Sequence, residues 1–258
     1  MYPDKIIFDM DLYQILIVVG FFFALLYLRL WGDRLGFSAS LQNLCIVGAV
    51  LAMLGGAGSA ILMQSLYHYL ESGIFEQNGA TFYGGLLGGA AVFLLIYFVG
   101  GTLLVKNGEA NERFFELSEI AAGSIAVAHA FGRLGCLCAG CCHGAVTNAW
   151  YGVYNATLGQ RTVPTQLFEA LFLFFLFALL TRRIHRNKSG NLSVYLCAYA
   201  LWRFLIEYIR EDERGATVVS FLTPSQFVAV LLFLVGVGFW FFQRALKQRN
   251  AHADGGEP

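Results

Sequence analysis

Seven apolar segments, each suited to cross a lipid bilayer as a helix, dominate the 258-residue sequence. A helix needs about 20 predominantly apolar residues to span the hydrocarbon core. Hydrophobic residues make up 57% of the chain and charged residues only 13%, whereas soluble domains are about one-quarter charged. The sequence therefore predicts an all-α polytopic membrane protein with seven transmembrane helices. The expected spans are 12–30, 41–66, 84–105, 117–137, 166–180, 192–209 and 224–242.

Basic residues divide unequally between the loops on the two sides of these spans. One alternate set of loops holds eleven Lys and Arg residues and the other holds four. Because basic residues accumulate on the cytoplasmic side, we expect the N-terminus outside and the C-terminus in the cytoplasm. The first residues lack the pattern of a removable signal peptide, so the first span is expected to remain. Residues 1–246 are expected to form a single membrane domain, and residues 247–258 a disordered cytoplasmic tail.

Two stretches rich in glycine, at 55–58 and 84–89, fall within the second and third spans. Small residues let helix backbones approach closely in a membrane, so helix packing is the simplest interpretation. The second stretch follows Tyr83 at a membrane boundary, which leaves a role in a site open for it.

An arginine lies inside the fourth span, within a stretch that reads Ala-His-Ala-Phe-Gly-Arg-Leu-Gly-Cys-Leu-Cys-Ala-Gly-Cys-Cys-His-Gly at 128–144. An arginine in a membrane helix costs at least roughly 2.5 kcal/mol, so Arg133 should have a partner or a function. In the sixth span, Tyr195, Tyr199, Arg203 and Glu207 recur every four residues and share one helix face. This stripe predicts either an Arg203–Glu207 ion pair with a purely structural role or a helix face that borders a cavity or substrate path.

The predicted topology places both intramembrane arginines near the outer leaflet. Arg133 lies about 6 Å and Arg203 about 9 Å below the outer ends of their helices, at about 1.5 Å per residue. A phosphate is the anion that fits two forked guanidinium groups at this depth. Snorkelling to the interface is the alternative that needs no ligand.

Four cysteines cluster after this arginine: Cys136, Cys138, Cys141 and Cys142, followed by His143. The spacing could hold a metal, and Cys138 and Cys141 form a C-x-x-C pair. The sequence has no second ligand pair and no βα context for a redox motif. The favoured interpretation is that small residues shape the backbone around a site, and no metal is expected. A metal site, a redox pair and an extracellular disulfide stay open as alternatives.

Five short motifs lie at membrane boundaries or inside the expected spans: Phe-Tyr-Gly-Gly-Leu-Leu-Gly at 82–88, Gly-Arg-Leu-Gly at 132–135, Pro-Thr-Gln-Leu-Phe-Glu-Ala at 164–170, Tyr199 with Arg203-Phe204 and Glu207, and Gln226. In these motifs and their order the chain resembles the prolipoprotein diacylglyceryl transferase family, over nearly its whole length. The resemblance implies transfer of the diacylglyceryl group from phosphatidylglycerol to the lipobox cysteine of prolipoproteins, forming a thioether and releasing glycerol phosphate. It also implies a bacterial cytoplasmic membrane location, with the active site toward the outer leaflet. No cofactor is expected, because the lipid already carries its leaving group. No nucleic acid partner is expected, since the formal net charge is zero.

The resemblance also assigns roles to particular residues. It implies catalytic roles for Arg133, Arg203 and Glu207, with Tyr83 at the position of the expected base, and substrate binding by Arg133, Arg203, Tyr199, Gly144, Gly84 and Gly85. His143 and His129 are catalytic candidates from their place in the sequence and not from the resemblance. The chain departs from the family signature at three positions: Cys136 replaces an asparagine, Cys141 a glutamate and Tyr83 a histidine.

The reaction requires a proton acceptor, because only a few per cent of an ordinary thiol is thiolate at neutral pH. Tyr83 occupies the expected base position, and His143 and His129 are substitutes; either histidine could instead only bond a carbonyl. Arg133 and Arg203 would neutralise charge growing on the leaving phosphate, with Glu207 orienting Arg203. Two other functions stay open: a thiol-redox or metal-handling membrane protein using residues 136–142, and a phospholipid-binding protein without activity.

Overall fold

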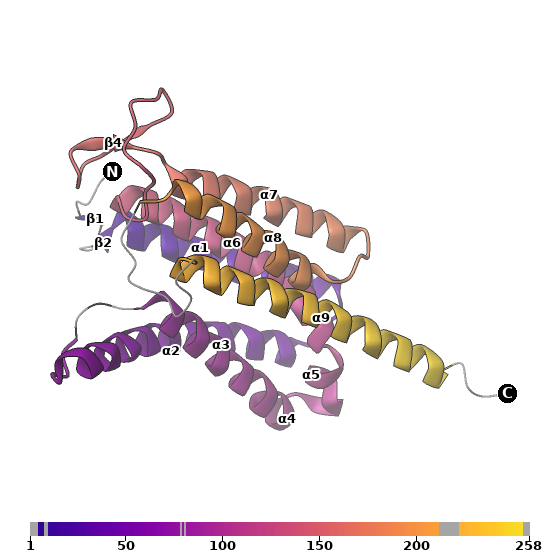
Figure 1. Ribbon diagram of the computed structural model, residues 1–258. Helices are drawn as coiled ribbons and strands as arrows, with labels where there is room; N and C mark the ends of the chain where they lie inside the picture. Colours follow the sequence, from indigo (N-terminus) through magenta and orange to yellow (C-terminus); the bar gives the residue numbers. More distant parts are fainter. Residues whose placement is uncertain (1–4, 8–9, 78, 80, 212–221, 255–258) are drawn as a thin grey trace. The chain divides into compact units, whose positions relative to one another are not determined.

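The computed structural model describes residues 5–7, 10–77, 79, 81–211 and 222–254 (Figure 1). Each of the seven predicted apolar segments is helical. The helices are α1 (Leu12–Arg34), α2 (Ala39–Ser72), α3 (Phe82–Leu95), α4 (Gly101–Leu104), α5 (Glu109–Glu112), α6 (Phe114–Ala139), α7 (Thr165–His185), α8 (Asn191–Ile206) and α9 (Pro224–Asp254), with the short turns η1 (Ile96–Gly100), η2 (Lys106–Gly108) and η3 (Glu207–Ile209).

Six helical stretches of the described residues are long and apolar enough to cross a membrane. They are Leu12–Arg34, Ala39–Leu70, Gly84–Leu104, Phe114–Ala139, Asn191–Ile209 and Pro224–Arg249. The prediction of an all-α polytopic membrane protein is therefore confirmed. The segment predicted at 166–180 forms α7 but is not among the six, so the seventh crossing stays a prediction. Helix α9 continues to Asp254, into the segment 247–258 for which disorder was predicted.

Two short antiparallel hairpins were not predicted. β1 (Lys5–Ile7) pairs with β2 (Met10–Asp11), and β3 (Val153–Asn155) pairs with β4 (Gln160–Thr162). Strands of two or three residues are too short to show a readable alternation of apolar and polar side chains. The second hairpin is joined to the loop after α6, because Thr147 N donates to Arg161 O at 2.9 Å.

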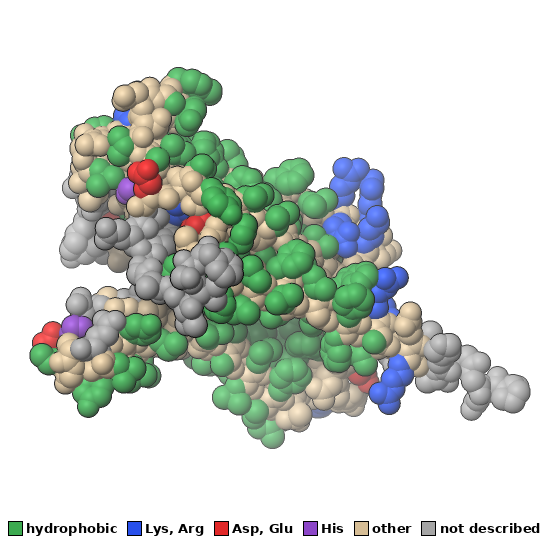
Figure 2. Space-filling view, in the orientation of Figure 1, with side chains coloured by type: hydrophobic (Ala, Val, Ile, Leu, Met, Phe, Trp, Pro, Cys, Tyr) green, Lys and Arg blue, Asp and Glu red, His purple; other side chains and the backbone are tan. Residues whose placement is uncertain are grey.

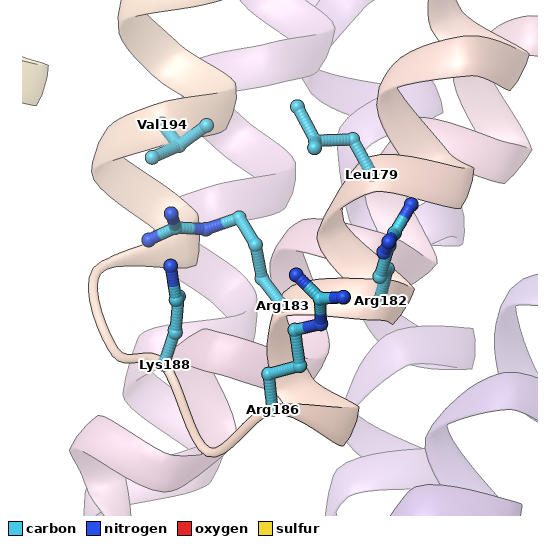
Figure 3. Close-up of a pocket in the computed structure, with 6 residues that line it drawn as sticks. All are labelled: Leu179, Arg182, Arg183, Arg186, Lys188 and Val194. Carbon is cyan, nitrogen blue, oxygen red and sulfur yellow. The ribbon is translucent and has the colours of Figure 1, made fainter.

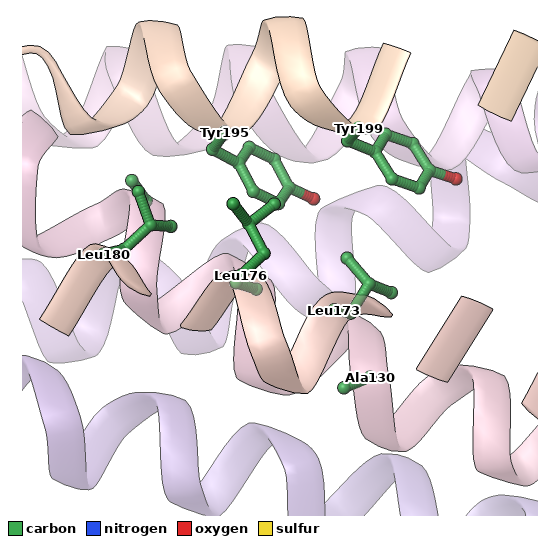
Figure 4. Close-up of a cluster of buried hydrophobic side chains, with 8 residues drawn as sticks. Ala130, Leu173, Leu176, Leu180, Tyr195 and Tyr199 are labelled. Atoms are coloured by element: carbon green, nitrogen blue, oxygen red, sulfur yellow. The ribbon is translucent and has the colours of Figure 1, made fainter. Parts of the chain in front are cut away.

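The chain divides into two compact units, which we describe separately. The first unit comprises Met1–Tyr27 and Ser118–Pro258, and the second comprises Leu28–Leu117. In the first unit, α6, α7 and α8 pack around a buried apolar core (Figure 4). Alanines at four-residue intervals on α6 share one face and leave room for leucines of α7 and tyrosines of α8. The core residues are Ala122, Ala126, Ala130, Leu173, Leu176, Leu180, Tyr195 and Tyr199.

Basic side chains gather at the end of the first unit where α7 leads into α8 (Figure 2). They border a cavity of about 410 Å³ lined by Leu179, Arg182, Arg183, Arg186, Lys188 and Val194 (Figure 3). Arg183 Nε donates to Asn191 Oδ1 at 2.9 Å, and Lys247 Nζ on α9 donates to Ser189 Oγ at 2.8 Å. The end of α7, the start of α8 and the end of α9 therefore lie together.

In the second unit, α2 and α3 pack closely through glycines from both glycine-rich stretches. A Cβ atom on Gly56 would lie 2.9 Å from the carbonyl oxygen of Gly85 and 3.3 Å from the Cα atom of Gly89. Any larger side chain would push the two backbones apart. The close approach that the glycines predicted is thus present.

Candidate active site

The candidate active site lies at the opposite end of the first unit from the basic cavity. Here α6 and α8 end, and α7 and α9 begin (Figure 1). Hydrogen bonds join these four helix ends: Thr165 Oγ1, at the start of α7, donates to Cys142 O at 2.8 Å. Arg203 Nη2 on α8 donates to Ser225 Oγ on α9 at 2.7 Å.

Arg133 on α6 is held by side chains from two neighbouring helices. Its Nε atom lies 3.1 Å from Oε1 of Glu169 on α7, whose side chain is 0% exposed. Its Nη2 donates to the hydroxyl of Tyr199 on α8 at 3.3 Å, and that hydroxyl donates to the same Glu169 oxygen at 2.8 Å. A buried cation requires such a partner, so the predicted need of Arg133 is met by a carboxylate from another helix.

Arg203 and Glu207 form the ion pair that their spacing predicted. Arg203 Nη1 lies 2.8 Å from Glu207 Oε2, and both side chains are buried. The pair is also tied to the start of α9, because Thr223 Oγ1 donates to Glu207 Oε1 at 2.9 Å. Arg203 is therefore fixed in position, which a snorkelling side chain would not be.

A third arginine belongs to the same group. Arg210 Nε lies 4.0 Å from Glu207 Oε2, and the Arg210 side chain is only 2% exposed. Ion pairs join these three arginines to the carboxylates of Glu169 and Glu207. Three guanidinium groups held in one site suit an anionic ligand.

The structure brings Arg133 and Arg203 into one site. Tyr199, which bonds Arg133, precedes Arg203 by about one helical turn, and both guanidinium groups act electrostatically on its hydroxyl. His129 lies against this tyrosine, with ring centroids 4.7 Å apart. Its Nδ1 shares a hydrogen bond of 3.1 Å with the Tyr195 hydroxyl, while its buried Nε2 has no hydrogen-bond partner in the described part of the chain.

The other candidate bases lie in different surroundings. His143 Nδ1 shares a hydrogen bond of 2.9 Å with the carbonyl oxygen of Gly144, so one ring nitrogen is occupied as a donor. Tyr83 lies on α3 in the second unit, and its side chain is outside the described residues. Gly84 and Gly85 also lie on α3, where both approach α2 closely. Their role in substrate binding stays a prediction.

Gly144 occupies a position where only glycine fits. A Cβ atom at this residue would lie 2.5 Å from the carbonyl oxygen of Ile209. The backbone of Gly144 also pairs with that of Arg210 as an antiparallel bridge. The glycine therefore lets the loop after α6 pack directly against the segment that carries the third arginine.

Three thiols lie together beside the arginines. The sulfur atoms of Cys136, Cys141 and Cys142 are all within 4.8 Å of one another, whereas Cys138 is not in the group. Hydrogen bonds from the Cys136 and Cys141 thiols lower the pKa of the Cys142 thiol; Arg210 and Arg133 also lower it, and burial opposes them. All six cysteines are free thiols in the structure. Cys141 is thus grouped with Cys136 and Cys142, and not with Cys138, the other member of the C-x-x-C pair.

The backbone of Cys142 is strained. Its φ angle is 62°, in the left-handed region that costs a non-glycine residue roughly 1 kcal/mol or more. Hydrogen bonds from α7 hold it there, with Thr165 bonding Cys142 O and Gln166 Nε2 bonding Cys141 O. Such strain persists only where the surroundings impose it, and it concentrates at functional sites.

Two site residues, Glu169 and Arg210, were not predicted. Glu169 is the one ionisable residue in the predicted apolar segment 166–180, a signal that could have identified it. Arg210 follows the sixth span and was counted among loop residues, and its burial depends on contacts between segments distant in sequence.

Comparisons with known proteins agree with this geometry. A model of the family described as prolipoprotein diacylglyceryl transferase matches residues 5–242. The chain is 31% identical to phosphatidylglycerol–prolipoprotein diacylglyceryl transferase 2 of Clostridium perfringens over 236 residues, which cover 87% of this chain and 88% of the relative. It is 30% identical to the phosphatidylglycerol–prolipoprotein diacylglyceryl transferase of Clostridium tetani over 246 residues, covering 92% and 94% of the two chains.

Proposed function

The chain belongs to the prolipoprotein diacylglyceryl transferase family, and from this premise we propose that it transfers the diacylglyceryl group of phosphatidylglycerol to the cysteine thiol of a prolipoprotein. The product is a thioether, and glycerol phosphate is the leaving group. The observation that supports this function is the buried group of three arginines and two glutamates at one end of the first unit.

The arginines bind the phosphate of the lipid. Arg133 and Arg203 each have a carboxylate partner, so they supply hydrogen-bond donors with their charge largely compensated. Arg210 adds a third buried guanidinium group to the site that receives the phosphate diester. Glu169 and Glu207 orient the guanidinium groups, and Tyr199 links the Arg133 pair to the helix that carries Arg203.

The transfer is a displacement at the glyceryl carbon next to the phosphate oxygen. A thiolate sulfur forms the C–S bond while the C–O bond breaks, and the phosphate gains one negative charge as it leaves. Arginines already fixed by buried carboxylates stabilise that charge without further rearrangement. His129, His143 and Tyr83 are the candidate proton acceptors. If the pH profiles of His129→Gln, His143→Gln and Tyr83→Phe all match the parent, none of them is the base.

The membrane topology follows from the two ends of the first unit. The basic end at residues 182–188 faces the cytoplasm, because positive residues accumulate there. The active-site end then faces the outer leaflet of a bacterial cytoplasmic membrane, with seven crossings and the N-terminus outside. A membrane-impermeant maleimide, added with a metal chelator to intact cells, should label the exposed Cys141. Labelling only after the cells are broken would reverse this orientation.

The phosphate role is tested by labelling a lipobox peptide with phosphatidylglycerol. Arg133→Ala or Arg203→Ala, in protein that still inserts, should reduce transfer by roughly 10²-fold or more, as for other preorganised donors to a developing anion. Arg29→Ala is the matched control, because Arg29 forms an exposed ion pair with Asp33 in the second unit. Full activity in both site variants would overturn the proposal. Binding of the lipid without any labelling by the parent protein would favour a non-enzymatic function.

A further inference from the structure

We propose that Cys136, Cys141 and Cys142 bind a zinc ion whose open coordination position takes the thiol of the incoming prolipoprotein. The proposal rests on the transfer function proposed above and names the group that activates its nucleophile. Sequence patterns favoured no metal at these cysteines and left a metal site only as an alternative.

The sulfur atoms are already close to the arrangement that zinc needs. They lie within 4.8 Å of one another, and a tetrahedral zinc with bonds of about 2.3 Å holds its sulfurs about 3.8 Å apart. Small rotations about the Cα–Cβ bonds can supply a difference of about 1 Å. The strained backbone of Cys142 and the hydrogen bonds from α7 to its loop hold two of the three ligands in place.

The number of ligands favours a catalytic site over a structural one. Among the described residues, no fourth Cys, His, Asp or Glu joins the group. Structural zinc sites use four protein ligands, whereas catalytic sites use three and leave a position for water or substrate. Cys141 is exposed and Cys142 partly exposed, so a substrate thiol can reach this position.

The charges around the cluster suit zinc bound by three thiolates. Such a complex carries one net negative charge, and Arg210 and Arg133 both act electrostatically on Cys142. Because Arg133 and Arg210 also belong to the phosphate site, the metal-bound sulfur and the scissile lipid bond would lie next to each other. The cluster and the arginines thus form one continuous site.

Zinc would promote loss of the proton from the substrate thiol, for which the reaction otherwise needs a base. A coordinating thiol is deprotonated by the metal, so the proton leaves to water when the prolipoprotein cysteine binds. The bound thiolate attacks the glyceryl carbon, the C–S bond forms and the C–O bond breaks. Glycerol phosphate leaves as a dianion, and the thioether product, now neutral, is a weaker ligand that can dissociate.

The test uses the full-length protein purified in detergent, with metal content as its first readout. After removal of loosely bound metal, the parent should retain nearly stoichiometric zinc. Cadmium exchanged into the site should give thiolate-to-metal absorption in the ultraviolet. Cys136→Ser and Cys142→Ser should lose both signals, whereas Cys138→Ser should keep them, because Cys138 lies outside the cluster on the same helix end. Parent protein that retains no zinc and shows no cadmium band would overturn the site.

Activity is the second readout and separates the metal proposal from the function itself. A strong chelator should abolish transfer to a lipobox peptide in the parent protein, and zinc should restore it, without any mutation that could disturb folding. Transfer that persists in the metal-free parent would refute zinc activation and leave the function standing. A protein that holds zinc at the three cysteines but never transfers lipid would instead refute the proposed function.

Discussion

Glu169→Gln removes the charge that balances Arg133 while keeping nearly the same shape. Removing one member of a buried ion pair costs roughly 3–5 kcal/mol, because the other charge stays buried without a partner. The Arg133 side chain is 13% exposed, and the glutamine oxygen can still accept the hydrogen bond from Tyr199. We therefore expect the lower end of that range, about 3 kcal/mol. At about 2 °C per kcal/mol for a chain of this size, the unfolding midpoint should fall by about 6 °C.

The assay is thermal unfolding in detergent, followed by circular dichroism, with and without phosphatidylglycerol. If Arg133 binds the lipid phosphate, the phosphate replaces the missing carboxylate, so the lipid should stabilise the variant more than the parent. Diacylglycerol, which has no phosphate, should show no such difference. Glu116→Gln is the matched control, because Glu116 is 46% exposed and its pair with Arg113 is solvated. Its effect should stay within about 1 kcal/mol. Equal stabilisation of parent and variant by phosphatidylglycerol would refute the role of Arg133 in phosphate binding.

Two further predictions concern the loop after α6. Gly144→Ala should abolish transfer and lower the unfolding midpoint, because its Cβ atom would lie 2.5 Å from the carbonyl oxygen of Ile209. Gly58→Ala is the control, because a Cβ atom at this position on α2 would meet no other atom within 4 Å. An active, stable Gly144→Ala protein would contradict the packing argument. In metal-free protein, the lowered pKa of Cys142 keeps its thiolate populated as the pH falls below the usual thiol value of about 8.5. Its iodoacetamide labelling, measured by mass spectrometry, should therefore persist to lower pH than in Cys136→Ala, whose side chain cannot donate a hydrogen bond, and identical pH profiles would exclude the hydrogen-bond effect.

Most of the helical architecture could be predicted from the sequence, because apolar length is a property of each segment alone. The predicted spans begin and end near the observed helices, although α2 and α9 continue beyond them to Ser72 and Asp254. Bilayer thickness sets the minimum apolar length of a span, whereas a helix can extend past the membrane wherever its backbone hydrogen bonds continue. The division of the chain at Tyr27 and Leu117, inside α1 and near the start of α6, depends on contacts between helices that hydropathy does not encode.

The site divides in the same way between local and distant contacts. Arg203 and Glu207 are four residues apart on one helix, so their ion pair followed from spacing alone. The partner of Arg133 depends on how α6 and α7 are rotated against each other, which a period of 3.6 residues does not determine. The thiol cluster shows the same limit within one segment. A left-handed turn at Gly140 and another at Cys142 direct the chain back toward the last turn of α6. Only this path brings the thiols of the loop to Cys136, a grouping that the linear spacing of Cys138 and Cys141 does not indicate.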